Sequence, residues 1–132
     1  MNIQLKGWRV KKLSFKINDN PSRTLKKDSL NLSIGHTFPE DNDKEFGIGF
    51  IIKIKDSDFK IELEMLFLFQ VDQIVDEEFK QSDFIKVNAP AIAFPYVRSY
   101  ISNLTLQSGF APIILPSVNF VTLNENKKNN DK

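Results

Sequence analysis

A catalytic or metal-binding role would need a cluster of reactive side chains, and this sequence offers few of them. It contains one histidine, His36, and no cysteine, which excludes thiolate catalysis, disulfides and cysteine-based zinc sites. His36 falls between Ile34 and Phe38 in an alternating apolar pattern, without a second metal ligand or a carboxylate motif nearby. A histidine in that setting is typical of a structural role rather than of acid–base catalysis.

Three further patterns are weak signs of a ligand site. The acidic run at 40–45 lacks the glycine and the terminal glutamate spacing of an EF-hand, so it predicts a solvated hairpin turn. Residues 47–49 read Gly-Ile-Gly, but Ile52 stands where a dinucleotide loop needs its third glycine, which favours a bulge or close packing. Glu62 and Glu64 share a strand face as ordinary surface acids. We therefore expect no enzymatic activity, no metal site and no cofactor.

The elements that would carry these residues are mainly β-strands. Strict alternation of apolar and polar residues predicts a strand at 30–38, and apolar residues at every second position predict strands at 46–54 and 59–71, the latter apolar on both faces in its second half. An earlier strand alternates with one parity at 8–10 and the other at 13–17, so it should change face at a bulge near Lys11-Lys12. Short loops between the strands predict an antiparallel meander.

After Pro90 the apolar spacing changes to that of a helix. Four residues form its main apolar stripe: Phe94, Val97, Ile101 and Leu104. Pro95 is best tolerated in a first turn, so we expect the helix to begin near residues 91–94. Gly109 is placed to cap its C-terminal end, and Tyr96 and Tyr100 lie on an adjoining stripe.

The remaining segments are less regular. Residues 72–90 fit either a loop or a short helix. Two prolines interrupt the apolar stretch 110–120, which predicts an extended segment unsuited to the interior of a sheet. The Asn- and Lys-rich residues 124–132 predict a disordered polar tail that follows a single domain over residues 1–123.

Composition restricts the partners and the cellular location. Lys plus Arg is 18 and Asp plus Glu is 17, and a formal charge of +1 gives no support to nucleic-acid binding. No apolar run is long enough for a signal peptide or a bilayer span, so we expect a cytoplasmic protein without membrane insertion. One helix can cover only one face of the sheet, and Leu66 and Leu68 lie on the other. Exposed apolar surface of this kind indicates a binding or oligomer surface.

Three segments resemble the SecB family of protein-export chaperones. Residues 88–98 contain an F-P-Y-x-R helix start, and residues 109–120 contain a G-F-x-P turn and a P-x-[VI]-N-F ending. Residues 10–15 resemble the first strand of the family, and the resemblance extends over residues 8–123. It implies an α+β fold, in which a long helix packs on a four-stranded antiparallel sheet.

The resemblance also implies a function and an assembly. Members are ATP-independent holdases that bind unfolded or non-native polypeptides in apolar grooves, for protein export. They form homotetramers, as dimers of dimers, in which Tyr96 and Tyr100 would lie at an interface between subunits. The positions that match the groove are Leu30, Leu32, Ile34, Ile113, Leu115, Val118 and Phe120.

Two departures from the family pattern affect the expected partners. Lys12 and Lys16 stand at acidic positions of the SecA contact and Lys60 at an aliphatic one, so only Glu62 retains the expected acid. A basic surface opposes the cationic tail of the SecA motor, which argues against standard delivery to SecA. The family's further helix after the Asn-Phe ending is replaced here by the polar tail, so we expect a more open groove.

These departures favour a SecB-like relative outside bulk export and leave its clients open. They could be general unfolded chains or a dedicated client, such as the antitoxin of a toxin–antitoxin pair. A carrier that encloses a small apolar ligand in its Phe-rich sheet is the alternative from a different class.

Overall fold

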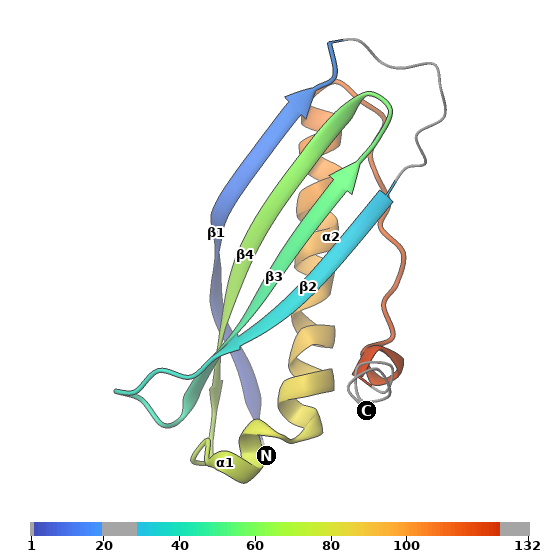
Figure 1. The fold of residues 1–132 in the computed structure, drawn as a ribbon. Coiled ribbons are helices and arrows are strands. Elements are labelled where there is room, and N and C mark those ends of the chain that lie inside the picture. The colour runs from blue at the N-terminus through green and yellow to red at the C-terminus, as the bar shows by residue number, and fades with distance from the viewer. Residues whose placement is uncertain (1, 20–28, 125–132) are drawn as a thin grey trace. The chain divides into compact units, whose positions relative to one another are not determined.

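The computed structural model describes residues 2–19 and 29–124, which belong to two compact units. One unit, Lys6–Gln70, contains most of the β-sheet, and the other joins Met1–Leu5 to Val71–Lys132 and contains the helices. A four-stranded antiparallel sheet and a long helix confirm the predicted α+β class (Figure 1). The predicted domain end at residue 123 stays a prediction. Of the predicted tail, 124–132, only Asn124 is among the described residues, and it is helical.

The sheet is a three-stranded meander with the first strand added at one edge. Its strands are β1 (Ile3–Ile17), β2 (Ser29–Thr37), β3 (Glu45–Lys55) and β4 (Phe59–Val71), in the order β1-β4-β3-β2 (Figure 1). The prediction of a simple meander is therefore wrong for β1, which neighbours β4 rather than β2. The end of β1 is tied to the β3–β4 turn, because the Asn18 N–H donates to the Asp58 carbonyl (2.8 Å) and the Asn18 amide group to that of Ser57 (3.0 Å).

Alternation along β3 and β4 separates a buried core face from an outer face. Every second residue of β3 from Phe46 to Ile54, and of β4 from Phe59 to Val71, is buried. The register places these residues opposite one another, and the rings of Phe46 and Phe69 stack with centroids 5.3 Å apart. Burial of each such side chain contributes about 1.5–3 kcal/mol, so this face fixes the strand register.

Strand β1 changes face where the sequence predicts it. Trp8 stacks on Phe67 (centroids 6.1 Å apart) and Phe15 on Phe59 (5.2 Å), although residues 8 and 15 have opposite parity. Between them, the consecutive residues 11 and 12 are both lysines that form ion pairs with outer-face glutamates of β4. Neighbouring side chains of a regular strand point to opposite faces, so the alternation is interrupted at this position.

The two glycines of β3, Gly47 and Gly49, differ in the space around them. Gly47 lies opposite Thr37 of β2, and a Cβ at position 47 would collide with the Thr37 hydroxyl. This confirms the predicted close packing. Gly49 lies opposite Gly35, and a Cβ at either position would meet nothing within 4 Å. The sheet surface is therefore flat and open on the outer face at this pair.

The second unit begins with short helical elements in the region that the sequence left open. They are α1 (Glu77–Lys80) and a π-helical turn, η1 (Phe84–Asn88), which leads directly into α2 (Ala89–Gln107). The Asp76 carboxylate caps α1 by accepting the Phe79 N–H (2.8 Å). Helix α2 thus begins before the predicted 91–94 and includes Pro95. The carbonyl that Pro95 leaves without a helical partner is that of Ala91, an exposed residue that water can reach.

Gly109 ends α2 as the sequence predicts. Its φ of 93° is accessible to glycine at little cost. The Gly109 N–H donates to the Leu106 carbonyl (3.2 Å) and the Phe110 N–H to that of Thr105 (3.0 Å), which is the hydrogen-bond pattern of a Schellman motif. The chain then leaves the helix and runs without helix or strand through Asn119, as an extended segment (Figure 1), which agrees with the prediction except at Phe120, where a helical turn begins.

Candidate functional site

Three polar side chains of α2 hold the extended segment 110–119 along the helix. Arg98 Nε donates to the Leu115 carbonyl (3.1 Å), and Ser102 Oγ donates to the Ile113 carbonyl (2.5 Å). Thr105 Oγ1 accepts the Ile113 N–H (2.9 Å). Figure 1 shows this segment (orange to red) running beside α2. Side chains therefore replace the strand partners that a segment interrupted by prolines cannot recruit.

Sequence reasoning missed this clamp. Arg98, Ser102 and Thr105 have the i, i+4, i+7 spacing of a single helix side, which is the signal that could have revealed them. Thr105 is fully buried, and its hydroxyl also lies 3.0 Å from the carbonyls of Ile101 and Ser102, to which it donates. A buried hydroxyl that both donates and accepts hydrogen bonds has a fixed orientation, so Thr105 is a structural anchor rather than a surface contact.

The predicted groove residues of this segment differ in accessibility. Leu115 and Phe120 are 2% and 4% exposed, and the Phe120 ring packs edge-on against Phe94 with centroids 5.7 Å apart. Ile113 and Val118 are partly exposed. The predicted groove residues of this segment are thus two buried anchors, Leu115 and Phe120, and two side chains that reach solvent in part.

The segment ends in a helical turn that begins at Phe120. Asn119 caps this turn by accepting the Thr122 N–H at its Oδ1 (3.1 Å), and its carbonyl accepts the Leu123 N–H. The Asn124 amide group donates to the Lys86 carbonyl (2.6 Å), and this bond fixes the turn to η1. Both ends of the extended segment are therefore anchored within the second unit.

The other predicted groove residues form a row on β2 in the first unit. Leu30, Leu32 and Ile34 pair with Ile54, Ile52 and Phe50, so they share the core face of the sheet. Leu30 is 41% exposed, and Leu32 and Ile34 are partly exposed. Because β2 is an edge strand, this row continues the apolar core face to the border of the sheet.

Helix α2 also carries an exposed apolar stripe. Ile92, Tyr96 and Leu106 are 42%, 41% and 56% exposed, and Tyr100 is partly exposed. These residues recur at helical spacing on a side distinct from the buried stripe that contains Val97 and Ile101. The predicted interface tyrosines thus belong to a surface that the monomer leaves accessible.

Glu62, the acid expected at a motor contact, is surrounded by lysines on the outer face. Its carboxylate lies 3.3 Å from Lys12 Nζ and 3.6 Å from Lys53 Nζ, and Lys11 Nζ lies 3.7 Å from Glu64. The hydrogen bond and charge of Lys12, with the charge of Lys53, lower the pKa of Glu62 below its ordinary value. Glu62 is therefore charged but already neutralised by its neighbours.

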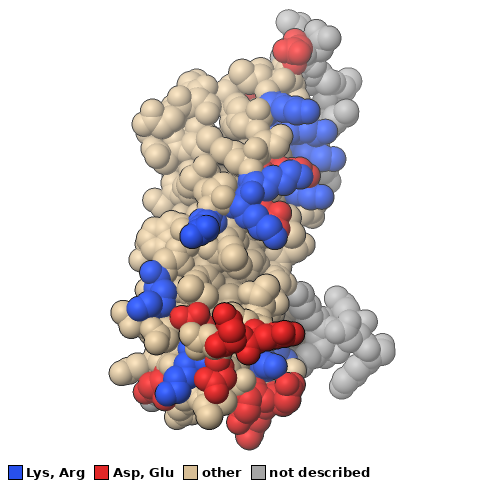
Figure 2. All heavy atoms as spheres, turned by 90° about the vertical axis from the view of Figure 1, so that its left-hand side faces the viewer, with Lys and Arg blue, Asp and Glu red and all other residues tan. Residues whose placement is uncertain are grey.

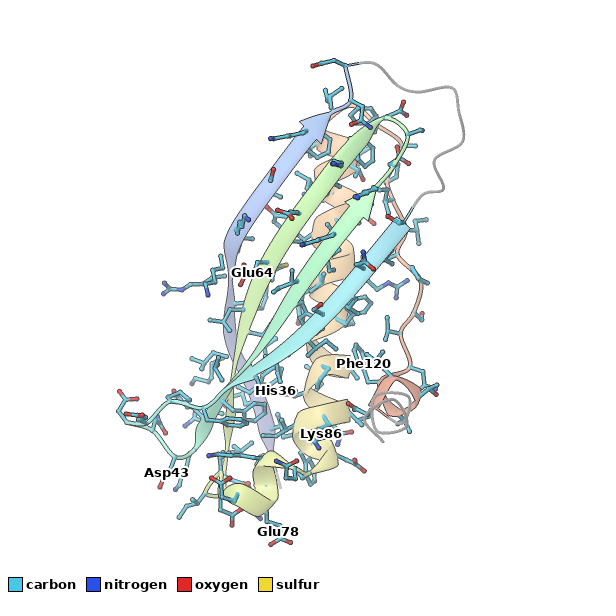
Figure 3. All side chains as sticks on the ribbon, in the orientation of Figure 1. His36, Asp43, Glu64, Glu78, Lys86 and Phe120 are labelled. Carbon is cyan, nitrogen blue, oxygen red and sulfur yellow. The ribbon has the colours of Figure 1, made fainter. Side chains whose placement is uncertain are left out.

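No grouping of three or more metal-ligating side chains occurs among residues 2–19 and 29–124. His36 is exposed on β2 opposite Ile48, and the acidic residues around Asp43 form the β2–β3 hairpin turn, as predicted (Figure 3). Within the same described ranges, no helix has the length and apolar character needed to cross a membrane.

Comparison with known proteins gives a consistent result for the whole chain. The family described as SecB, preprotein translocase subunit SecB, matches residues 1–131. Protein-export protein SecB of Magnetococcus marinus is 30% identical over 83% of this chain and 68% of the relative. SecB of Orientia tsutsugamushi (strain Boryong) is 32% identical over 94% of this chain and 82% of the relative. SecB of Roseobacter denitrificans is 33% identical, but the aligned region is only 57% of this chain and 46% of that protein.

Solved structures show the same fold at lower identity. A SecB-like chaperone of Mycobacterium tuberculosis, in complex with a ChAD peptide from the HigA1 antitoxin, superposes with a TM-score of 0.69 at 15% identity. The alignment covers 89% of this chain and 90% of that one. A protein of unknown function from Streptococcus agalactiae gives a TM-score of 0.56 at 11% identity, over 89% and 98% of the two chains.

The four-stranded antiparallel sheet, the long helix and the anchored extended segment define a chain of the SecB-like chaperone fold. This chain belongs to the SecB family.

Proposed function

We propose that this protein is an ATP-independent, non-enzymatic holdase that binds non-native polypeptides in the cytoplasm. The observation that carries the proposal is the extended segment 110–119, whose backbone is held by Arg98, Ser102 and Thr105. Because side chains of α2 hold the backbone of this segment, its apolar side chains can remain accessible at the surface and do not collapse into the core. A surface of that kind binds by apolar burial, which needs no particular client sequence.

Clients would contact two apolar rows, each described within its own unit. One is Leu30, Leu32 and Ile34 on β2, and the other is the accessible part of segment 110–119, represented by Ile113 and Val118. Leu115 and Phe120 would support this surface from beneath, since both are buried. Covering the exposed part of a residue such as Leu30 contributes about 1 kcal/mol, so several contacts are needed for stable binding.

A homotetramer is the assembly that we propose, with the exposed stripe of α2 at an interface between subunits. The stripe contains Tyr96 and Tyr100, and exposed aromatic residues are enriched where subunits meet. The lysines around Glu62 oppose a cationic partner, so we expect delivery to SecA by the standard contact to be lost.

A dedicated antitoxin client is the more specific alternative. It is supported by the structural similarity to a chaperone that was solved with an antitoxin peptide. The lysines around Glu62 also favour a dedicated client, because they oppose binding to the cationic tail of SecA and therefore argue against delivery for export. An antitoxin tail would use the same apolar rows as other unfolded chains.

The test is calorimetric titration with a permanently unfolded polypeptide and with its folded counterpart. We expect binding of the unfolded form alone, with a negative heat-capacity change. Leu32→Asp and Val118→Asp should each weaken it at least tenfold, whereas Asn31→Asp, which introduces the same carboxylate on the opposite face of β2, should leave it intact. Normal binding by both apolar variants would refute the surface assignment. Binding of neither polypeptide, with a lipid retained through purification, would support the small-ligand carrier instead.

A further inference from the structure

The outer face of the sheet carries a dense group of lysines at one end. Six belong to it, which we call the lysine cluster: Lys11, Lys12, Lys16, Lys53, Lys55 and Lys60. Glu62 and Glu64 lie among them on β4, so these eight outer-face residues carry a net charge of +4 in a chain whose total is +1. The turn that joins Lys55 to Lys60 adds Asp56 and Asp58 at the end of the cluster. Figure 2 shows the gathered lysine side chains with the carboxylates between them.

Three of these lysines form no ion pair with another described residue. Glu62 and Glu64 are engaged by Lys11, Lys12 and Lys53. Among residues 2–19 and 29–124, no carboxylate lies within 4.0 Å of Lys16, Lys55 or Lys60. These three come from three adjacent strands and line a shallow hollow of about 230 Å³. The rest of its lining is Ser14, Lys53, Ile54, Ile61 and Glu62, whose carboxylate is already paired with Lys12 and Lys53.

The strand register brings two of the unpaired lysines close together, and their repulsion destabilises the sheet. Lys55 of β3 and Lys60 of β4 are directly opposite each other on the outer face. Like charges at opposed positions of an antiparallel pair destabilise the sheet, and a bound anionic group would relieve their repulsion. The hollow between them is open to solvent, so an anionic side chain could enter it.

The other end of the same face is apolar and flat. Leu66, Leu68 and Ile51 are 36%, 37% and 42% exposed. The register places Leu66 beside the Gly35–Gly49 pair, where no side chain covers the backbone. Glycines in a strand interior permit close approach of another backbone. The eight residue steps from Lys60 to Leu68 correspond to about 27 Å of strand, so both ends lie within reach of one short extended segment.

We propose that this outer face binds an acidic, partly apolar extended segment of a partner protein. Acidic residues of the segment contact Lys16, Lys55 and Lys60, and its apolar residues cover Leu66 and Leu68 over the glycine pair. This surface uses none of the residues of the two rows proposed for unfolded clients, and on β2 it lies on the face opposite Leu30, Leu32 and Ile34. A nucleic acid would use the lysines but would leave the apolar end exposed, so a polypeptide is the better complement.

Fluorescence anisotropy with a labelled peptide, Asp-Glu-Asp-Gly-Ile-Leu-Phe-Gly, tests the proposal. We expect binding that weakens as salt rises, and a Lys55→Gln/Lys60→Gln variant with an affinity reduced about fivefold or more. The matched control is Lys44→Gln/Lys86→Gln, which removes the same charge outside the cluster and should bind normally. Leu66→Ser should also weaken binding, whereas a peptide with Lys in place of Asp and Glu should not bind this face. Circular dichroism verifies that each variant is folded.

Several results would overturn the inference. One is equal binding by the wild type and Lys55→Gln/Lys60→Gln, and another is an equal loss in the Lys44→Gln/Lys86→Gln control. Tighter binding of a labelled single-stranded oligonucleotide would assign the lysines to nucleic acid, and a change in sedimentation of the lysine variants would assign them to contacts between copies. Leu32→Asp separates this proposal from holdase activity, because it should weaken binding of unfolded chains at least tenfold and leave binding of the acidic peptide unchanged.

Discussion

The contact between Thr105 and Ile113 allows a prediction with a calculable size. Thr105→Val keeps the volume and the β-branch of a fully buried side chain, so it opens no cavity. It removes the acceptor of the Ile113 N–H, which lies 2.9 Å from Oγ1 in the native protein. An amide left unpaired in the interior costs about 1–3 kcal/mol, and we expect the lower half of this range because Ile113 is only partly buried.

Urea unfolding followed by the fluorescence of Trp8, the single tryptophan, measures this loss. For a chain of this size the dependence of the unfolding free energy on urea is roughly 2 kcal/mol per molar, so the midpoint should fall by about 0.5–1 M. If segment 110–119 is part of the client surface, the affinity for an unfolded polypeptide should fall as well. Both effects should appear in the same variant.

A pair of serines supplies the matched control. Ser102→Ala removes the hydroxyl that donates to the Ile113 carbonyl, and Ser99→Ala makes the same change at an exposed position of the same helix. Both gain the same helix propensity, so their difference isolates one hydrogen bond of about 1 kcal/mol. If Ser102→Ala is as stable as Ser99→Ala, and Thr105→Val as stable as the wild type, the side-chain clamp does not hold the segment and the reasoning fails.

Three other perturbations have defined outcomes. Gly109→Ala should lose about 1–2 kcal/mol because φ is 93°, whereas Gly7→Ala, which has open space and an ordinary backbone, should lose much less in the same denaturation assay. Gly47→Ala should lose about 1–3 kcal/mol through its collision with Thr37, and Thr37→Ala should restore stability in the double variant; no recovery would contradict that contact. The pKa of Glu62 is lowered from its ordinary value of about 4.5, so its ionised form stabilises the fold above that value, and this contribution disappears as the pH falls through the lowered pKa of the native state. The stability difference between the wild type and Glu62→Gln should thus be constant near neutral pH and vanish in acid, and a difference independent of pH would refute it.

Much of the fold could be predicted from local pattern. Period-two alternation located β2, β3 and β4, because one side of each strand is apolar and the pleat makes faces alternate. The parity change in β1 predicted its change of face, and Gly109 predicted the end of α2. The start of α2 is predicted too late. The prediction allowed Pro95 only in the first turn, whereas the helix begins at Ala89 and contains Pro95 in its interior.

The candidate surfaces were predicted less completely. The sequence identified the apolar residues of segment 110–120 but could not distinguish exposed Ile114 from buried Leu115, because an extended segment without strand partners has no fixed pleat. It also gave no role to Ser102 and Thr105, whose hydrogen bonds depend on a backbone that returns along the helix.

By itself, then, the sequence determined which residues alternate, where the chain turns, that cysteine chemistry is absent and which family the chain resembles. These properties depend on neighbours along the chain, so composition and spacing contain them. Only the tertiary structure decided that β1 lies beside β4, that Lys55 of β3 lies directly opposite Lys60 of β4, and that Thr105 holds Ile113. Such contacts depend on the order of the strands in the sheet and on the path of the loops. The same alternation of apolar and polar residues is compatible with several strand pairings, so the sequence pattern alone does not select one.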